Sequence, residues 1–87
     1  MKIEFDLAKD AVNFAKHGVS LGRAAELVIF AIEPDQRQDY GEGRYRAFGV
    51  LDGTAYCLAF TLRGSTMRAI SLRRARLKEF RRHVAHP

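Results

Sequence analysis

The chain has 87 residues, a formal net charge of +5 and a single cysteine. One cysteine excludes an internal disulfide framework, and no apolar run approaches the roughly 18 residues that a membrane-spanning helix needs. The N-terminal residues also lack the apolar core of a signal peptide. We therefore expect a single domain over residues 1–87, with one modest core, in the reducing cytoplasm.

The positive charge is concentrated in the last third of the chain. Arg63–Arg82 holds eight cations and one acid, Glu79, whereas residues 1–62 are slightly acidic. Arginine outnumbers lysine eleven to four, and its planar guanidinium grips phosphate in two places. This asymmetry predicts binding to a polyanion, most often a nucleic acid. The alternative is a solvated amphipathic helix that happens to be rich in arginine.

The first predicted elements are a short strand and a helix. Lys2–Phe5 has alternating apolar residues, and Asp6 has the side chain of a helix N-cap. Gly18 suits the left-handed residue that ends a helix, so this helix runs to about Lys16. Its apolar residues Leu7, Ala11 and Phe14 fall on one stripe, with Ala8, Val12 and Ala15 beside it.

A second helix and an ambiguous segment follow. Ser20 is a second N-cap, and the apolar spacing predicts a helix over about Leu21–Leu27. Val28–Ile32 is apolar and partly β-branched, which fits either the end of that helix or a strand. Glu33–Gly43 is polar, with one proline and two glycines, and predicts a loop.

The second half of the chain predicts three strands joined by hairpins. Arg44–Leu51 is followed by Asp52-Gly53, the signal for a type I′ turn. Thr54–Leu62 is almost continuously apolar, as in a central strand that is covered on both faces. The third strand is Thr66–Leu72, and a helix runs from Arg73 to about Val84. The predicted fold is therefore α+β: a small antiparallel meander packed with two N-terminal helices and a C-terminal helix.

Several kinds of chemistry are not expected. His83 and His86 are three residues apart at the end of the chain, but structural metal sites need four donors. Cys57 lies in the most apolar strand and is expected to be a packed core residue. Gly41-Glu42-Gly43 matches no phosphate-binding loop. We expect no metal and no cofactor.

Metal-independent RNA cleavage needs few parts. A base takes the proton of the 2′-hydroxyl, cations stabilise the charge that develops at phosphorus, and an acid protonates the departing 5′ oxygen. The candidates for charge stabilisation are Arg63, Arg68, Arg73 and Arg74, and those for proton transfer are Lys16, His17, Glu79 and His83.

Each proton-transfer candidate also has a structural alternative. Glu79 is spaced to pair with Arg76 or Arg82 on its own helix. His17 is placed to interact with the C-terminal end of the first helix, where a cation is favourable.

The sequence resembles the BrnT toxins. In that family an aromatic-Asp pair opens a helix that carries a spaced Lys and Asn and ends in Lys-His-Gly-Val-Ser, followed by a helix rich in Ala and Glu. A Glu-x-Arg-aromatic strand with a later Gly comes next, and an Arg-x-Ile-Ser-Ala-Arg-x-Ala segment precedes a Glu in the last helix. The matching positions here are Phe5, Asp6, Lys9, Asn13, Lys16–Ser20, Ala24, Ala25, Glu42–Tyr45, Gly49, Arg68–Ala75 and Glu79.

This resemblance implies a RelE-like fold and the toxin of a type II toxin–antitoxin module. Such a toxin is a ribonuclease that shuts down translation. It is neutralised by a BrnA antitoxin with a ribbon-helix-helix DNA-binding part, and the complex represses its own operon. DNA would then be reached only through the antitoxin.

The chain departs from the family pattern at three places. The loop before Glu42 has no His, although relatives often carry one there. Leu72 stands where the family often has Ala, and His83 stands near the position of a Tyr. The alternative to an active toxin is therefore a catalytically weak or inactive relative that serves as an RNA- or antitoxin-binding module.

Charge pattern and resemblance together give the candidate site. Ser71 is a further position carried over from the family, with capping of the last helix as its structural alternative, and Arg44 is placed to pair with Glu42 or Asp39. The candidate catalytic residues are Arg63, Arg68, Arg73, Glu79 and His83, and the candidate RNA-binding residues are Lys16, His17, Arg44, Arg74, Arg76, Lys78, Arg81 and Arg82.

Overall fold

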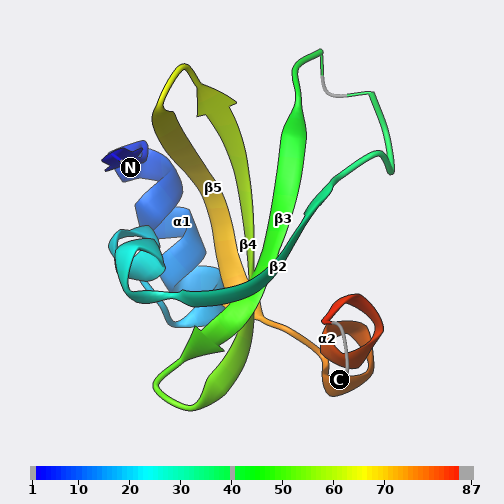
Figure 1. Cartoon of the computed structure of the whole chain (residues 1–87). Helices are drawn as coiled ribbons and strands as arrows, with labels where there is room; N and C mark the ends of the chain where they lie inside the picture. Colours follow the sequence, from blue (N-terminus) through cyan, green and yellow to red (C-terminus); the bar gives the residue numbers. More distant parts are fainter. Residues whose placement is uncertain (1, 40, 85–87) are drawn as a thin grey trace.

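A computed structural model describes residues 2–39 and 41–84 of the chain (Figure 1). Among these residues, no helix is long and apolar enough to cross a membrane. The elements in chain order are β1 (Lys2–Glu4), α1 (Leu7–His17), the 3₁₀ helix η1 (Leu21–Glu26), β2 (Val28–Pro34), β3 (Arg44–Leu51), β4 (Thr54–Arg63), β5 (Thr66–Arg74) and α2 (Leu77–His83).

The five strands form one mixed sheet in the order β1-β5-β4-β3-β2. The predicted antiparallel meander is confirmed for β2 to β5. β1 differs, because it pairs in parallel with β5, with Lys2 opposite Thr66 and Glu4 opposite Arg68. Helices α1 and η1 lie against one side of the sheet, and α2 lies apart from them beyond the end of β5 (Figure 1). The α+β prediction is therefore confirmed.

Three local predictions need correction. Val28–Pro34 is a strand, so the loop begins two residues later than predicted. The second helix is a 3₁₀ helix that ends at Glu26. The last helix begins at Leu77 rather than at Arg73, because β5 continues to Arg74 and the N–H of the next residue still donates to Ala55 O at 3.0 Å.

Capping residues set the limits of α1 as predicted. The Asp6 carboxylate accepts from Ala8 N at 2.8 Å and Lys9 N at 3.1 Å. Gly18 has a φ of 72° and donates its N–H to Phe14 O at 2.8 Å. Ser20 caps η1 in the same way. Ser71, in contrast, lies within β5 and caps no helix, and α2 begins without a side-chain cap.

The core lies between the sheet and the α1–η1 side. Leu21, Leu58 and Leu72 have no exposed surface, and each such side chain contributes about 1.5–3 kcal/mol on burial. The remaining members of this cluster are Val19, Ala24, Leu27, Ala47, Leu51, Phe60, Met67 and Ala69.

Gly49 allows β2 to approach β3 at the start of that pair. A Cβ atom at this position would lie 2.3 Å from the Val28 carbonyl oxygen and 3.0 Å from Leu27 Cγ. The first of these distances is far below van der Waals contact. The glycine is therefore required by the close approach of backbone to backbone.

Helix α1 is attached to the sheet by a polar side chain. Asn13 is 4% exposed. Its amide nitrogen donates to Val19 O and Leu72 O, both at 2.9 Å, and its amide oxygen accepts from Leu72 N at 3.1 Å. The side chain thus satisfies both backbone groups of Leu72 as a neighbouring strand would.

We expect Asn13→Ala to lower the free energy of unfolding by about 3 kcal/mol, because it leaves two buried carbonyls and one buried N–H without their partner. Urea unfolding followed by circular dichroism measures the change. Val12→Ala, on the exposed side of the same helix, is the control and should change stability by less than about 0.5 kcal/mol. A loss below 1 kcal/mol in Asn13→Ala would contradict this role.

Candidate active site

The sheet face turned away from α1 carries arginines among small and aromatic side chains. Phe48 lies opposite Cys57 in the β3–β4 register, and Cys57 lies opposite Arg73 in the β4–β5 register. Directly opposed residues project to the same face, and Arg46, two residues before Phe48, shares it. This face therefore carries arginines from two separate strands, with Arg44 and Arg46 on β3 and Arg73 on β5.

Helix α2 packs over part of this face through two ring contacts. The His83 imidazole stacks on Phe48, with centroids 4.6 Å apart and planes at 13°. Phe80 meets Phe30 of β2 edge to face, with centroids 6.4 Å apart. These contacts hold α2 where its one acidic side chain faces the arginines.

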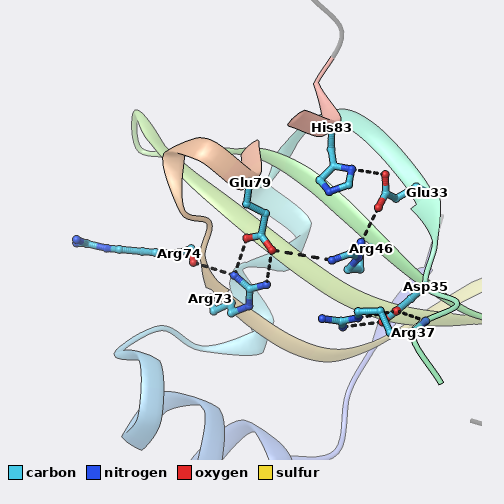
Figure 2. Close-up of polar contacts among 8 residues, drawn as sticks. All are labelled: Glu33, Asp35, Arg37, Arg46, Arg73, Arg74, Glu79 and His83. Atoms are coloured by element: carbon cyan, nitrogen blue, oxygen red, sulfur yellow. Dashed lines mark hydrogen bonds and ion pairs between the residues drawn. The ribbon is translucent and has the colours of Figure 1, made fainter. Parts of the chain in front are cut away.

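Glu79 makes the central ion pair of the site (Figure 2). Arg73 donates to its two carboxylate oxygens at 2.9 and 3.1 Å, and Arg46 Nη1 lies 3.9 Å from it. The predicted alternative, a pair with Arg76 or Arg82 on the same helix, is wrong. The short helix directs Glu79 toward the sheet instead of along its own surface.

Further charges extend this arrangement toward β2 (Figure 2). Arg46 also donates to Glu33 at 2.7 Å, and the other oxygen of Glu33 pairs with His83 Nδ1. Nearby, the fully buried Asp35 carboxylate accepts two bonds from Arg37, both at 2.8 Å. Acidic and basic groups therefore alternate from His83 to Arg73.

A cleft of about 660 Å³ opens where the end of α1 meets the end of β5 and the start of α2. A second cavity of about 380 Å³ adjoins it under α2 and shares Arg37, Arg76 and Glu79 with it. We call the larger cavity the basic cleft. It is lined by Lys16, His17, Arg37, Arg73, Arg74, Arg76 and Glu79.

The basic cleft and its neighbour bring together most of the predicted site residues. Lys16, His17, Arg73, Arg74, Arg76 and Glu79 line the cleft, and Lys78, Arg82 and His83 line the adjoining cavity.

Four predicted residues lie elsewhere. Arg63 is at the far end of β4, with Glu42 at 3.8 Å, and Arg68 donates to Glu4 of β1 at 3.2 Å. Arg44 lines a different cavity beside the 35–43 loop. None of these, nor Arg81, is among the described residues that line the basic cleft or its neighbour. A catalytic role for Arg63 and Arg68 stays a prediction.

Sequence reasoning missed Arg37, Arg46 and Glu33. Glu33 and Arg46 become neighbours only through the β2–β3 register. Their spacing along the chain does not predict this contact. Arg37 lies in the segment that was predicted to be a loop. The one available signal was the alternation Arg44-Tyr45-Arg46 in a predicted strand, which places both arginines on one face.

The environment sets the protonation of two cleft residues. The hydrogen bonds from Arg73 lower the pKa of Glu79 below its usual range, against the opposing effect of burial. Burial lowers the pKa of His17, and the nearby charges of Lys16 and Arg73 lower it further. At neutral pH, Glu79 is therefore an anion and His17 is a neutral imidazole that can accept a proton.

The described residues contain no group of three or more His, Cys, Asp and Glu side chains arranged to hold a metal ion. His86, weighed above with His83 as a possible ligand pair, lies outside them. Cys57 is buried as expected, and burial raises the pKa of its thiol.

Comparison with known families is decisive for the identity of the chain. Residues 5–79 match the model of the ribonuclease toxin, BrnT, of type II toxin–antitoxin systems. The chain belongs to the BrnT family. The BrnT match ends at Glu79, so it includes the Arg73–Glu79 pair but not His83. A search of curated proteins finds no match. Membership of the BrnT family implies a ribonuclease toxin with an antitoxin partner.

We expect the Glu79–Arg73 pair to stabilise the fold in a pH-dependent way. The pKa of Glu79 is lower in the folded state, so its contribution is present above the unfolded value of about 4.3 and is lost as pH falls through the folded value. Glu79→Gln should lower the free energy of unfolding, measured with urea, by about 1.5 kcal/mol at pH 7 and by less at pH 3.

Glu42→Gln is the matched control. Glu42 lies 3.8 Å from Arg63 and is about half exposed. We therefore expect Glu42→Gln to lower the free energy of unfolding by less than about 0.5 kcal/mol at either pH. An unchanged cost of Glu79→Gln between pH 7 and pH 3 would show that the ion pair does not contribute in this way.

Proposed function

We propose that this chain is an endoribonuclease that cleaves RNA in the basic cleft without a metal ion. One observation carries the proposal: His17, whose pKa is lowered by burial and by the charges of Lys16 and Arg73, lines a cleft together with Lys16 and four arginines. Cations attract and orient the phosphate backbone, and a neutral imidazole beside them can take a proton. Membership of a ribonuclease toxin family supports the same reaction.

In the proposed reaction His17 removes the proton of the 2′-hydroxyl. The 2′ oxygen then bonds to phosphorus and the bond to the 5′ oxygen breaks, giving a 2′,3′-cyclic phosphate and a free 5′-hydroxyl. Arg73 stabilises the additional negative charge on the phosphate oxygens. Lys16 and His83 remain the candidates that protonate the leaving oxygen.

Glu79 acts in this mechanism by positioning Arg73. Its lowered pKa makes it a poor proton donor at neutral pH. Arg73 uses three of its five N–H groups, two on Glu79 and one on the Arg74 carbonyl at 3.2 Å. The other two are available for a phosphate, and the ion pair fixes their direction.

The cellular role follows from the family. We propose that RNA loss inhibits translation, that a BrnA-type ribbon-helix-helix antitoxin neutralises this single-domain toxin, and that the complex represses its operon. DNA is then contacted only through the antitoxin. A RelE-like fold and a cytoplasmic location are parts of the same proposal, supported by family membership and by the α+β architecture.

We expect Arg73→Ala to lower kcat/KM on RNA at least 100-fold, because it removes a preorganised cation from the developing charge. Arg23→Ala is the control. Arg23 pairs with Glu26 and Asp52 outside the cleft, and its loss should change kcat/KM less than threefold. Induced expression of the free chain should arrest growth and degrade total RNA, and Arg73→Ala should abolish both effects.

Normal growth and intact RNA with a folded wild-type chain would refute the nuclease. The chain would then be the non-catalytic binding module. A nuclease activity that survives Arg73→Ala would place the reaction outside the basic cleft.

The pH dependence of cleavage identifies the base. Because the pKa of His17 is lowered, the rise of kcat/KM with pH should have its midpoint below pH 6.5, and kcat/KM should be constant near pH 7. Lys16→Gln should move the midpoint upward, since it removes a positive charge that disfavours the imidazolium. His17→Gln should eliminate the rise of kcat/KM at acidic pH and lower kcat/KM roughly 100-fold or more. If His83→Gln eliminates this rise instead, His83 is the base.

A further inference from the structure

The apolar face of α1 is turned to solvent. Six apolar residues cover this side of the helix and all are exposed: Leu7, Ala8, Ala11, Val12, Phe14 and Ala15. Leu7 is 79%, Val12 65% and Phe14 59% exposed. An amphipathic helix ordinarily turns such a stripe to the core. Here the polar side faces inward, with Asn13 buried and Asp10 accepting from Ser20 Oγ and Leu21 N at 3.0 and 2.7 Å.

This surface continues into a groove that leads to the basic cleft. A groove of about 310 Å³ runs between α1 and β5, with Ala8, Val12 and Ile70 among its walls. Lys9 and Lys16 also line it. Lys16 and His17 belong to both the groove and the cleft. Whatever covers the apolar face and fills the groove therefore reaches the entrance of the cleft.

The charge of this surface favours an acidic partner over a second copy of the chain. A second copy of the chain would bring lysines of α1 against the same lysines, on two molecules that each carry a net charge of +5. The acid of α1 that could offset them, Asp10, is already bonded to Ser20 and Leu21. A segment with apolar residues on one side and Asp or Glu along its edge can cover the apolar face of α1 and pair with the lysines beside it.

We propose that the outward face of α1 and the adjoining groove bind an acidic amphipathic segment of the antitoxin. This inference rests on the proposed function only in identifying the partner as the antitoxin. Leu7 and Phe14 are seven residues apart, about 10 Å along the helix, so a segment of three helical turns covers both. Its acidic edge lies over Lys9 and Lys16 and closes the cleft to RNA.

The test measures the Kd of the chain for the antitoxin encoded with it, by isothermal titration calorimetry. All proteins carry Arg73→Ala, so that toxicity does not limit expression and binding is measured without cleavage. Leu7→Glu and Phe14→Glu should each raise the Kd at least tenfold, because each places a charge in an apolar contact that excludes water. Lys9→Glu should also raise the Kd and reduce its dependence on salt.

Ile32→Glu is the matched control. Ile32 is 55% exposed on β2, the opposite edge strand of the sheet, and offers the competing apolar surface. The Kd of the Ile32→Glu variant for the antitoxin should change less than threefold. Circular dichroism and thermal unfolding verify that each variant is folded, as the exposure of the replaced side chains leads us to expect. If either α1 variant does not fold, Lys9→Glu carries the test.

Two results would overturn the inference. One is that Ile32→Glu weakens binding while Leu7→Glu and Phe14→Glu do not, which assigns the antitoxin to β2. The other is a dimer of the free chain that Phe14→Glu dissociates, which assigns the face to a second copy. A failure of the nuclease proposal is seen separately, as the absence of cleavage by the chain that retains Arg73.

Discussion

A single buried amide determines how the rest of this molecule is arranged. Among the described residues, β1 pairs with β5 from Thr66 to Arg68, so the later part of β5 needs another partner for its edge. Asn13 supplies one through its two bonds with Leu72. Because a polar residue must point inward for this, the apolar stripe of α1 must point outward. The same attachment places Lys16 and His17, one turn later, beside the end of β5.

The basic cleft contains its own countercharges. Glu79 lies between the guanidinium groups of Arg73 and Arg46, and Glu33 lies between Arg46 and the His83 imidazole. Each carboxylate reduces the net positive charge of the cleft, but it also holds a guanidinium in one orientation. For a reaction that depends on the placement of charge around phosphorus, fixed direction contributes more than an additional mobile cation.

What could be predicted from the sequence was local. Asp6 and Gly18 set the limits of α1, and Asp52-Gly53 joins β3 to β4, because each acts within a few residues. The parallel pairing of β1 and the Glu33–Arg46 contact depend on register between distant segments, which no local pattern encodes. The basic end contains Arg73 and Glu79, which the structure brings together in an ion pair. The charge pattern also suggested Arg63 on β4 and Arg68 on β5, which pair with Glu42 and Glu4 away from the cleft.

The pairing of Lys2 with Thr66, and of Asn13 with Leu72, joins the beginning of the chain to a strand near its end. During synthesis these contacts cannot form until β5 has left the ribosome. The basic cleft is completed later still, because Glu79 follows β5. A truncated chain that ends before β5 therefore lacks Arg73, Arg74, Arg76 and Glu79, and the basic cleft cannot form in it.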